Sequence, residues 1–85
     1  MDMRRGRDEI IFQILDVCVM GAIKTKIVHK ANLNFSMVGP YITMLTKNGM
    51  LDAKEGSRVI YETTPKGKEV LKNFQTIESE LLVSH

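Results

Sequence analysis

The sequence predicts a single α+β domain in which two short helices joined by a tight turn precede a β-hairpin and a last helix. Apolar residues recur at helical spacing before residue 49 and again after residue 65. In between, residues 50–55 alternate roughly as a strand does, and residues 58–63 are rich in β-branched side chains. The chain has 85 residues, of which 44% are hydrophobic and 26% charged, an ordinary composition for one soluble globular domain.

The first helix is expected to begin at Asp8 and to end at Gly21. Acidic residues fall in its first turn, where the helix dipole favours negative charge. Its apolar stripe, with the spacing i, i+3, i+4, i+7, comprises Ile11, Ile14, Leu15 and Cys18. Cys18 is the only cysteine, which excludes an internal disulfide, and we interpret it as a small buried apolar residue.

A very short strand is expected at residues 22–24, followed by a second helix that Thr25 caps. The side chains expected on the buried side of this helix are Ile27, Val28 and Ala31. Residues 32–34 are expected to form the turn into a third helix. Leu33 and Phe35 are interpreted as an apolar plug between the two helices.

The third helix is expected to have Ser36 as its N-cap and to stop at Gly49, which can adopt the left-handed conformation. Its predicted buried side comprises Val38, Ile42 and Leu45. The opposite face, small and polar with two methionines at its flank, comprises Ser36, Met37, Pro40, Thr43, Met44 and Lys47. A short helix, a turn and a capped helix with such a face are typical of a helix-turn-helix.

After the third helix, a β-hairpin is expected with strands at residues 50–55 and 58–63. Gly56 and Ser57 suit a two-residue turn between them. Tyr61 is interpreted as a core contact on the return strand. A hairpin that directly follows a helix-turn-helix converts it to a winged helix-turn-helix, which is the fold we predict.

Positive charge is concentrated in the predicted helix-turn-helix, although the formal net charge is only +2. No Asp or Glu lies between residues 17 and 51, whereas this block holds Lys24, Lys26, Lys30 and Lys47. Such an asymmetry produces a local positive patch. Lys54 and Arg58 would flank the hairpin tip, where a phosphate or minor-groove contact is feasible. The alternative is that the lysines are merely solvated and the hairpin charges only protect an edge strand.

Thr64 and Pro65 predict the start of the last helix, as its cap and its first residue. The apolar residues that recur along it at spacings of 4, 3 and 4 are Val70, Phe74, Ile77 and Leu81. Its second half has more apolar surface than so small a domain can cover, so we expect a second copy of the chain to bury it. The alternative is that the whole helix folds back on its own domain. The expected organisation is a DNA-binding domain at residues 1–64 and a dimerisation helix at residues 65–85.

In this order, the elements resemble an archaeal winged-helix family of small DNA-binding regulators, the ArnR-like group, which is similar to small archaeal chromatin-associated winged-helix dimers. The residues that carry the resemblance are 24–27, 31–35, 41–42, 45, 49–51 and the stretch 64–68, which reads TPKGK. The resemblance covers about residues 8–74. It implies DNA binding, a transcription-related role and dimerisation through the last helix. The sequence departs from the family at Gly39 and Pro40, where such proteins usually carry polar or charged helix formers.

The expected function is therefore that of a DNA-binding transcriptional regulator that binds duplex DNA as a homodimer in the cytoplasm. The residues expected to contact DNA are Lys24, Lys26, Lys30, Ser36, Met37, Tyr41, Thr43, Lys47, Lys54 and Arg58. A winged helix used for protein–protein assembly and an architectural chromatin protein are the alternatives. The sequence contains no nucleophile with a base, no carboxylate pair in a plausible pocket and no phosphate loop, so we expect no enzymatic activity. No metal, cofactor, membrane span or secretory signal is expected either.

Overall fold

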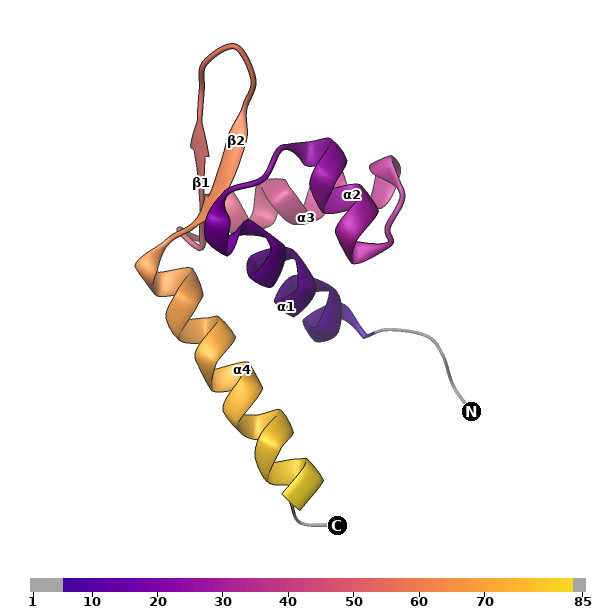
Figure 1. The fold of residues 1–85 in the computed structure, drawn as a ribbon, viewed down its shortest axis with the longest axis vertical. Helices are drawn as coiled ribbons and strands as arrows, with labels where there is room; N and C mark the ends of the chain where they lie inside the picture. Colours follow the sequence, from indigo (N-terminus) through magenta and orange to yellow (C-terminus); the bar gives the residue numbers. More distant parts are fainter. Residues whose placement is uncertain (1–5, 84–85) are drawn as a thin grey trace.

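The winged helix-turn-helix is confirmed by a computed structural model of the chain, which describes the backbone of residues 6–83 and the side chains of residues 6–77. The elements, in chain order, are α1 (Arg7–Val17), the 3₁₀-helix η1 (Cys18–Met20), α2 (Lys24–Ala31), α3 (Phe35–Lys47), β1 (Leu51–Lys54), β2 (Ile60–Thr63) and α4 (Pro65–Val83). In Figure 1 the first three helices gather beside the base of the hairpin, and α4 runs from that base away from the hairpin tip.

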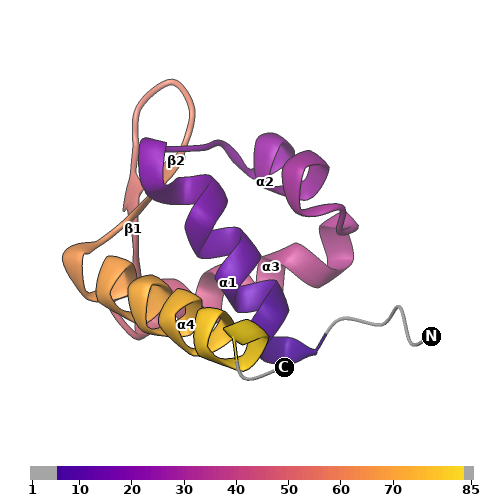
Figure 2. The ribbon, with the colours of Figure 1, turned by 60° about the horizontal axis from the view of Figure 1, so that its bottom comes forward.

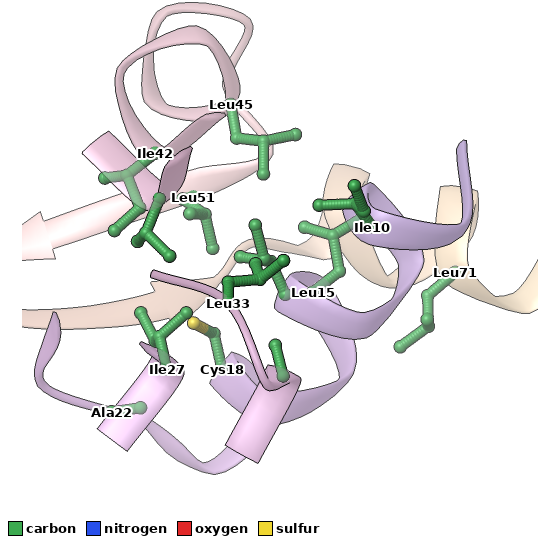
Figure 3. Close-up of a cluster of buried hydrophobic side chains, with 13 residues drawn as sticks. Ile10, Leu15, Cys18, Ala22, Ile27, Leu33, Ile42, Leu45, Leu51 and Leu71 are labelled. Atoms are coloured by element: carbon green, nitrogen blue, oxygen red, sulfur yellow. The ribbon is translucent and has the colours of Figure 1, made fainter. Parts of the chain in front are cut away.

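The core lies where α1, α2, α3 and β1 meet (Figure 3). Its most fully buried side chains are Ile14, Leu15, Cys18, Ile27, Val38 and Leu45. Burying a large aliphatic side chain contributes about 1.5–3 kcal/mol, so this cluster is the main source of stability in so small a domain. The predicted buried stripe of the third helix is confirmed, since Val38, Ile42 and Leu45 are each at most 5% exposed.

The predicted apolar plug is only half correct. Leu33 is buried, whereas Phe35 is 54% exposed. The left-handed backbone of Asn32 (φ 55°) ends α2 and carries the chain into the turn, where the amide of Leu33 donates to the carbonyl of Val28 at 3.0 Å. Phe35 is the first residue of α3, and the buried part of that helix starts one turn later, so its ring remains in solvent.

Two predicted helix caps are wrong. The N-cap of α3 is Asn34 rather than Ser36, and its Oδ1 accepts from the amide of Met37 at 2.9 Å and from the hydroxyl of Ser36 at 2.7 Å. The N-cap of α2 is Ile23 rather than Thr25. The cause is the backbone of Ala22, which exchanges two hydrogen bonds with that of Tyr61 and keeps the chain extended until the helix begins. This single bridge is what remains of the short strand predicted at residues 22–24.

The hairpin has a longer loop than predicted. β1 and β2 are antiparallel and pair Leu51 with Thr63 and Lys54 with Ile60, so that residues 55–59 form the loop. The expected two-residue turn is therefore wrong, and Gly56 does not have the positive φ that such a turn requires of its glycine. At the base of the hairpin, the hydroxyl of Thr63 donates to the carbonyl of Leu15 in α1 at 2.6 Å, which ties β2 to the helices.

α4 begins as predicted and packs on α1. The hydroxyl of Thr64 caps it by accepting from the amide of Gly67 at 3.1 Å. Figure 2 shows α4 crossing α1, and at this crossing the rings of Phe12 and Phe74 stack with their centroids 5.0 Å apart. Ile77, about one turn further along α4, is 58% exposed.

Candidate nucleic-acid interface

The outward face of α3 lies beside the hairpin and forms one wall of a groove. One part of this groove, with a volume of about 370 Å³, is lined by Ile42, Thr43, Thr46, Lys47, Ala53 and Tyr61. A smaller part, of about 150 Å³, is lined by Lys24, Gly39, Ile42, Thr43 and Tyr61. We call the two parts together the α3–wing groove. Its walls come from α3, the N-terminus of α2 and both strands, so the helix-turn-helix and the hairpin face the same space.

A lysine from α2 reaches onto α3 at Gly39. A Cβ built on Gly39 would lie 3.6 Å from the Nζ atom of Lys24. The ammonium group therefore lies over the outward face of α3, next to Thr43 in the groove. The sequence alone did not indicate this juxtaposition, since the two residues belong to different helices.

The lysines of the acid-free block are available for a partner. Lys24, Lys26, Lys30 and Lys47 are all exposed. Within residues 6–77, whose side chains the structure describes, none of them forms an ion pair. Arg58, in the loop of the hairpin, is exposed as well. The structure thus presents positive charge on α2, at the C-terminal end of α3 and at the hairpin tip.

Lys54 differs from the other predicted cations. Its Nζ atom lies 2.7 Å from the Oε1 atom of Glu62 on the neighbouring strand. This hydrogen bond raises the pKa of Lys54 and lowers the pKa of Glu62. Both side chains remain largely in solvent, so the pair contributes little to stability. It does offset the charge of Lys54, which leaves Arg58 as the predicted tip cation without a described carboxylate partner.

The remaining predicted contact residues of α3 do not all face the groove. Ser36 and Met37 are exposed at the start of the helix, beside the Asn34 cap. Tyr41 is half-buried and lines a separate pocket of about 360 Å³ with Arg7, Pro40 and Met44. Thr46, which lines the groove, was missed by the sequence analysis, although it lies three residues after Thr43 on the same outward face.

The four predicted dimerisation residues fall into two groups. Val70 is half-buried against the core of its own domain, and Phe74 stacks on Phe12. Ile77 projects into solvent, and the side chain of Leu81 lies outside the described residues. In the described part of α4, Val70 and Phe74 therefore pack on their own domain, whereas Ile77 is exposed.

Other kinds of site have little support in the residues that the structure describes. Burial raises the pKa of the Cys18 thiol from 9.0 to about 12, which keeps it protonated and unreactive. Among the described residues, no three His, Cys, Asp or Glu side chains are grouped so as to hold a metal ion. None of the helices in this part of the chain is both long and apolar enough to span a bilayer.

Comparison with known proteins agrees with this architecture. A family model described as winged helix-turn-helix matches residues 4–81. The uncharacterised protein MJ0287 of Methanocaldococcus jannaschii is 34% identical over 72 residues, which is 84% of this chain and 71% of that protein.

Two solved structures are also similar. Sso10a-2, a DNA-binding protein from Sulfolobus solfataricus, superposes with a TM-score of 0.79 at 34% identity, covering 94% of this chain and 88% of that one. The second is BpsR of Bordetella bronchiseptica, whose DNA binding is regulated by 6-hydroxynicotinic acid. It superposes with a TM-score of 0.78 at 15% identity, over 98% of this chain and 62% of that one, which shows a shared fold alone. The narrower resemblance to the ArnR-like group stays a prediction.

Proposed function

This chain belongs to the winged helix-turn-helix family, and from that premise we propose that it binds duplex DNA as a homodimer and regulates transcription in the cytoplasm. The observation that supports this most strongly concerns the block of residues 17–51, which has no Asp or Glu between its ends. Its four lysines are exposed and lack an ion-pair partner among the described residues. The similarity to Sso10a-2, which is a DNA-binding protein, supports the same proposal.

In the proposed complex, α3 enters the major groove and the hairpin tip lies against the adjacent backbone. Lys24, Lys26 and Lys30 on α2 contact phosphates, as does Lys47 at the end of α3. Arg58 extends this contact from the hairpin loop, whereas Lys54 takes part only when its bond to Glu62 opens. Phosphate contacts fix position and orientation, and they make the affinity depend on salt.

Dimerisation through α4 completes the proposal. Ile77 is 58% exposed on a helix whose earlier apolar residues pack on their own domain. A second copy of α4 would cover this residue and the apolar positions that the sequence continues beyond it. In this arrangement residues 1–64 bind DNA and residues 65–85 join the two copies.

An architectural DNA-binding role is the second candidate, and one observation favours it. α3, from Phe35 to Lys47, contains no Arg, Asn or Gln, the side chains that read guanine or adenine through two hydrogen bonds. Such a helix binds DNA without strong base readout. A winged helix used for protein assembly is the third candidate, and it has no need for the acid-free block.

The test is binding to duplex DNA of random sequence, measured over a range of salt concentrations. Each side chain that neutralises a phosphate contributes about 0.9 to the slope of log affinity against log salt. Lys30→Ala should therefore weaken binding to all duplexes alike and reduce the slope by about 1.8, because the proposed dimer carries two copies of Lys30. Lys72→Ala removes the same charge from the exposed face of α4 and should leave the slope unchanged. If micromolar wild-type protein shows no salt-sensitive binding to any duplex, the assembly role replaces the proposal.

A further inference from the structure

The first turn of α4 is bonded to the end of α3 at several points. The Nζ atom of Lys66 donates to the carbonyl of Asn48 at 2.8 Å. Thr64 makes two more bonds, from its hydroxyl to the carbonyl of Gly49 at 2.6 Å and from its amide to the carbonyl of Met50 at 3.0 Å. We call residues 48–50 and 63–67 the α3–α4 junction.

The junction also leaves no room between the two backbones. Gly67 is buried, and a Cβ at this position would overlap the carbonyl oxygen of Met50 and lie 2.7 Å from the Cγ2 atom of Thr63. Backbone atoms cannot give way as the end of a flexible side chain can. Glycine is therefore required here by close approach of the first turn of α4 to the chain that follows α3, and not by its own backbone conformation.

The C-terminal end of α3 is capped by backbone hydrogen bonds. Gly49 is left-handed (φ 75°), and its amide donates to the carbonyl of Thr46 at 3.1 Å. The amide of Met50 donates to the carbonyl of Leu45 at 2.9 Å. Together these two hydrogen bonds form a Schellman motif, in which a left-handed glycine ends the helix. The ammonium of Lys66 adds a positive charge where the helix dipole is negative. The carbonyl that Lys66 binds therefore belongs to a fixed structure.

We infer that the α3–α4 junction, together with the packing of Leu71 and Phe74 on the rest of the domain, fixes the angle between the helix that enters DNA and the helix that joins the two copies, with Lys66 and Gly67 as the positioning residues of the junction. This inference rests on the proposed function, because it assigns those roles to α3 and α4. It goes further in stating what sets the distance between the two α3 helices of the dimer.

The geometry makes this angle important. α4 spans Pro65–Val83, which is roughly 28 Å at 1.5 Å per residue. A rotation of about 10° at the junction would move the far end of such a helix by roughly 5 Å, which exceeds the spacing of about 3.4 Å between successive nucleotides of a strand. Paired recognition helices must match the helical repeat of DNA, about 34 Å or a multiple of it. A loose junction would lose that match.

The first experiment measures the junction without DNA. Spin labels are attached at Thr43→Cys on α3 and Asn73→Cys on α4, both exposed positions, while the buried Cys18 stays unlabelled. Labelled protein is diluted with unlabelled protein, so that the measured distance lies within one chain. We expect one narrow distance distribution in the wild type and in the control Lys72→Met. Lys66→Met, which keeps the side-chain length and removes the ammonium, should give a broader distribution than Lys72→Met, and Gly67→Ala should shift its centre.

The second experiment measures affinity for random duplexes of increasing length. A rigid dimer should show a steep rise in affinity at the length that first spans both α3 helices, and Lys66→Met should make this rise gradual while Lys72→Met keeps it steep. Unchanged distances and an unchanged rise in Lys66→Met would overturn the inference, even if Gly67→Ala fails to fold. A wild type that binds no duplex would instead refute the proposed function, and the distance measurement would still decide whether the junction is rigid.

Discussion

Two glycines, one inside α3 and one at its end, are expected to respond differently to alanine. Gly39 lies inside the helix, where glycine costs about 0.8–1.0 kcal/mol relative to alanine. Beyond the chain neighbours, the nearest atom that the new Cβ would meet is the Nζ atom of Lys24 at 3.6 Å, an ordinary contact at the end of a flexible side chain. Pro40 opposes the gain, because in helical backbone the Cβ of the residue before a proline clashes with the proline ring. Since the two effects offset each other, Gly39→Ala should change the free energy of unfolding by less than about 1 kcal/mol.

Gly49 ends the same helix at φ 75°, a conformation that costs an L-residue about 1–2 kcal/mol. The nearest atom to its new Cβ would be the Cδ atom of Lys66 at 3.9 Å, so backbone strain is the only penalty. Gly49→Ala should lower the free energy of unfolding by about 1–2 kcal/mol. Urea unfolding followed by circular dichroism measures both changes, and the dependence on urea should be the same in all three proteins. If Gly49→Ala loses no more stability than Gly39→Ala, the explanation of Gly49 by its left-handed backbone is wrong.

Three further predictions concern the hairpin, α4 and the buried thiol. Thr63→Val keeps the shape of the side chain but leaves the carbonyl of Leu15 without its 2.6 Å partner, so urea unfolding should show a loss of about 1–2 kcal/mol, and Thr63→Ser should lose less. Ile77→Asp places a charge on the proposed dimer surface and should give a folded monomer by light scattering; a wild type that is already monomeric at high micromolar concentration would contradict the dimer. Because burial raises the pKa of Cys18 to about 12, the folded protein should resist iodoacetamide near pH 9 and react only after unfolding. For the same reason the free energy of unfolding should fall as the pH rises from about 9 towards 12, and fall less in Cys18→Ala.

Local patterns predicted the helices of this fold well. The spacing of Val38, Ile42 and Leu45 identified the buried face of α3, and Thr64 before Pro65 identified the start of α4. The hairpin register could not be predicted in the same way. A turn pair such as Gly56-Ser57 is only a local preference, whereas the base of the hairpin is tied to α1 by a hydrogen bond from Thr63 to a carbonyl 48 residues earlier in the chain, a contact that no local pattern shows.

The candidate site was predicted by residue type but not by arrangement. The acid-free block identified the lysines, since charge composition can be counted along the chain. The bond between Lys54 and Glu62 depends on the register of the hairpin, and the position of Lys24 over Gly39 depends on how two helices pack. In the sequence, Lys66 is notable only as part of the TPKGK stretch that carries the family resemblance. The structure shows a physical role for it, since its ammonium group donates to the carbonyl of Asn48 at the end of α3.

The outward face of α3 and the α3–α4 junction together indicate how this protein would select DNA. Since α3 has no Arg, Asn or Gln and Lys47 is proposed to contact a phosphate, the groups left to contact bases are hydroxyls and methyls, such as those of Thr43 and Met37. Each missing two-bond contact forgoes about 1–3 kcal/mol of discrimination. A rigid junction can restore part of this through geometry, because two α3 helices held at a fixed separation favour DNA whose shape and flexibility suit that separation. Selection from a randomised duplex library at physiological salt should therefore return a broad, shape-related preference. A sharp consensus bound more than about a thousandfold over bulk DNA would show that α3 reads bases directly after all.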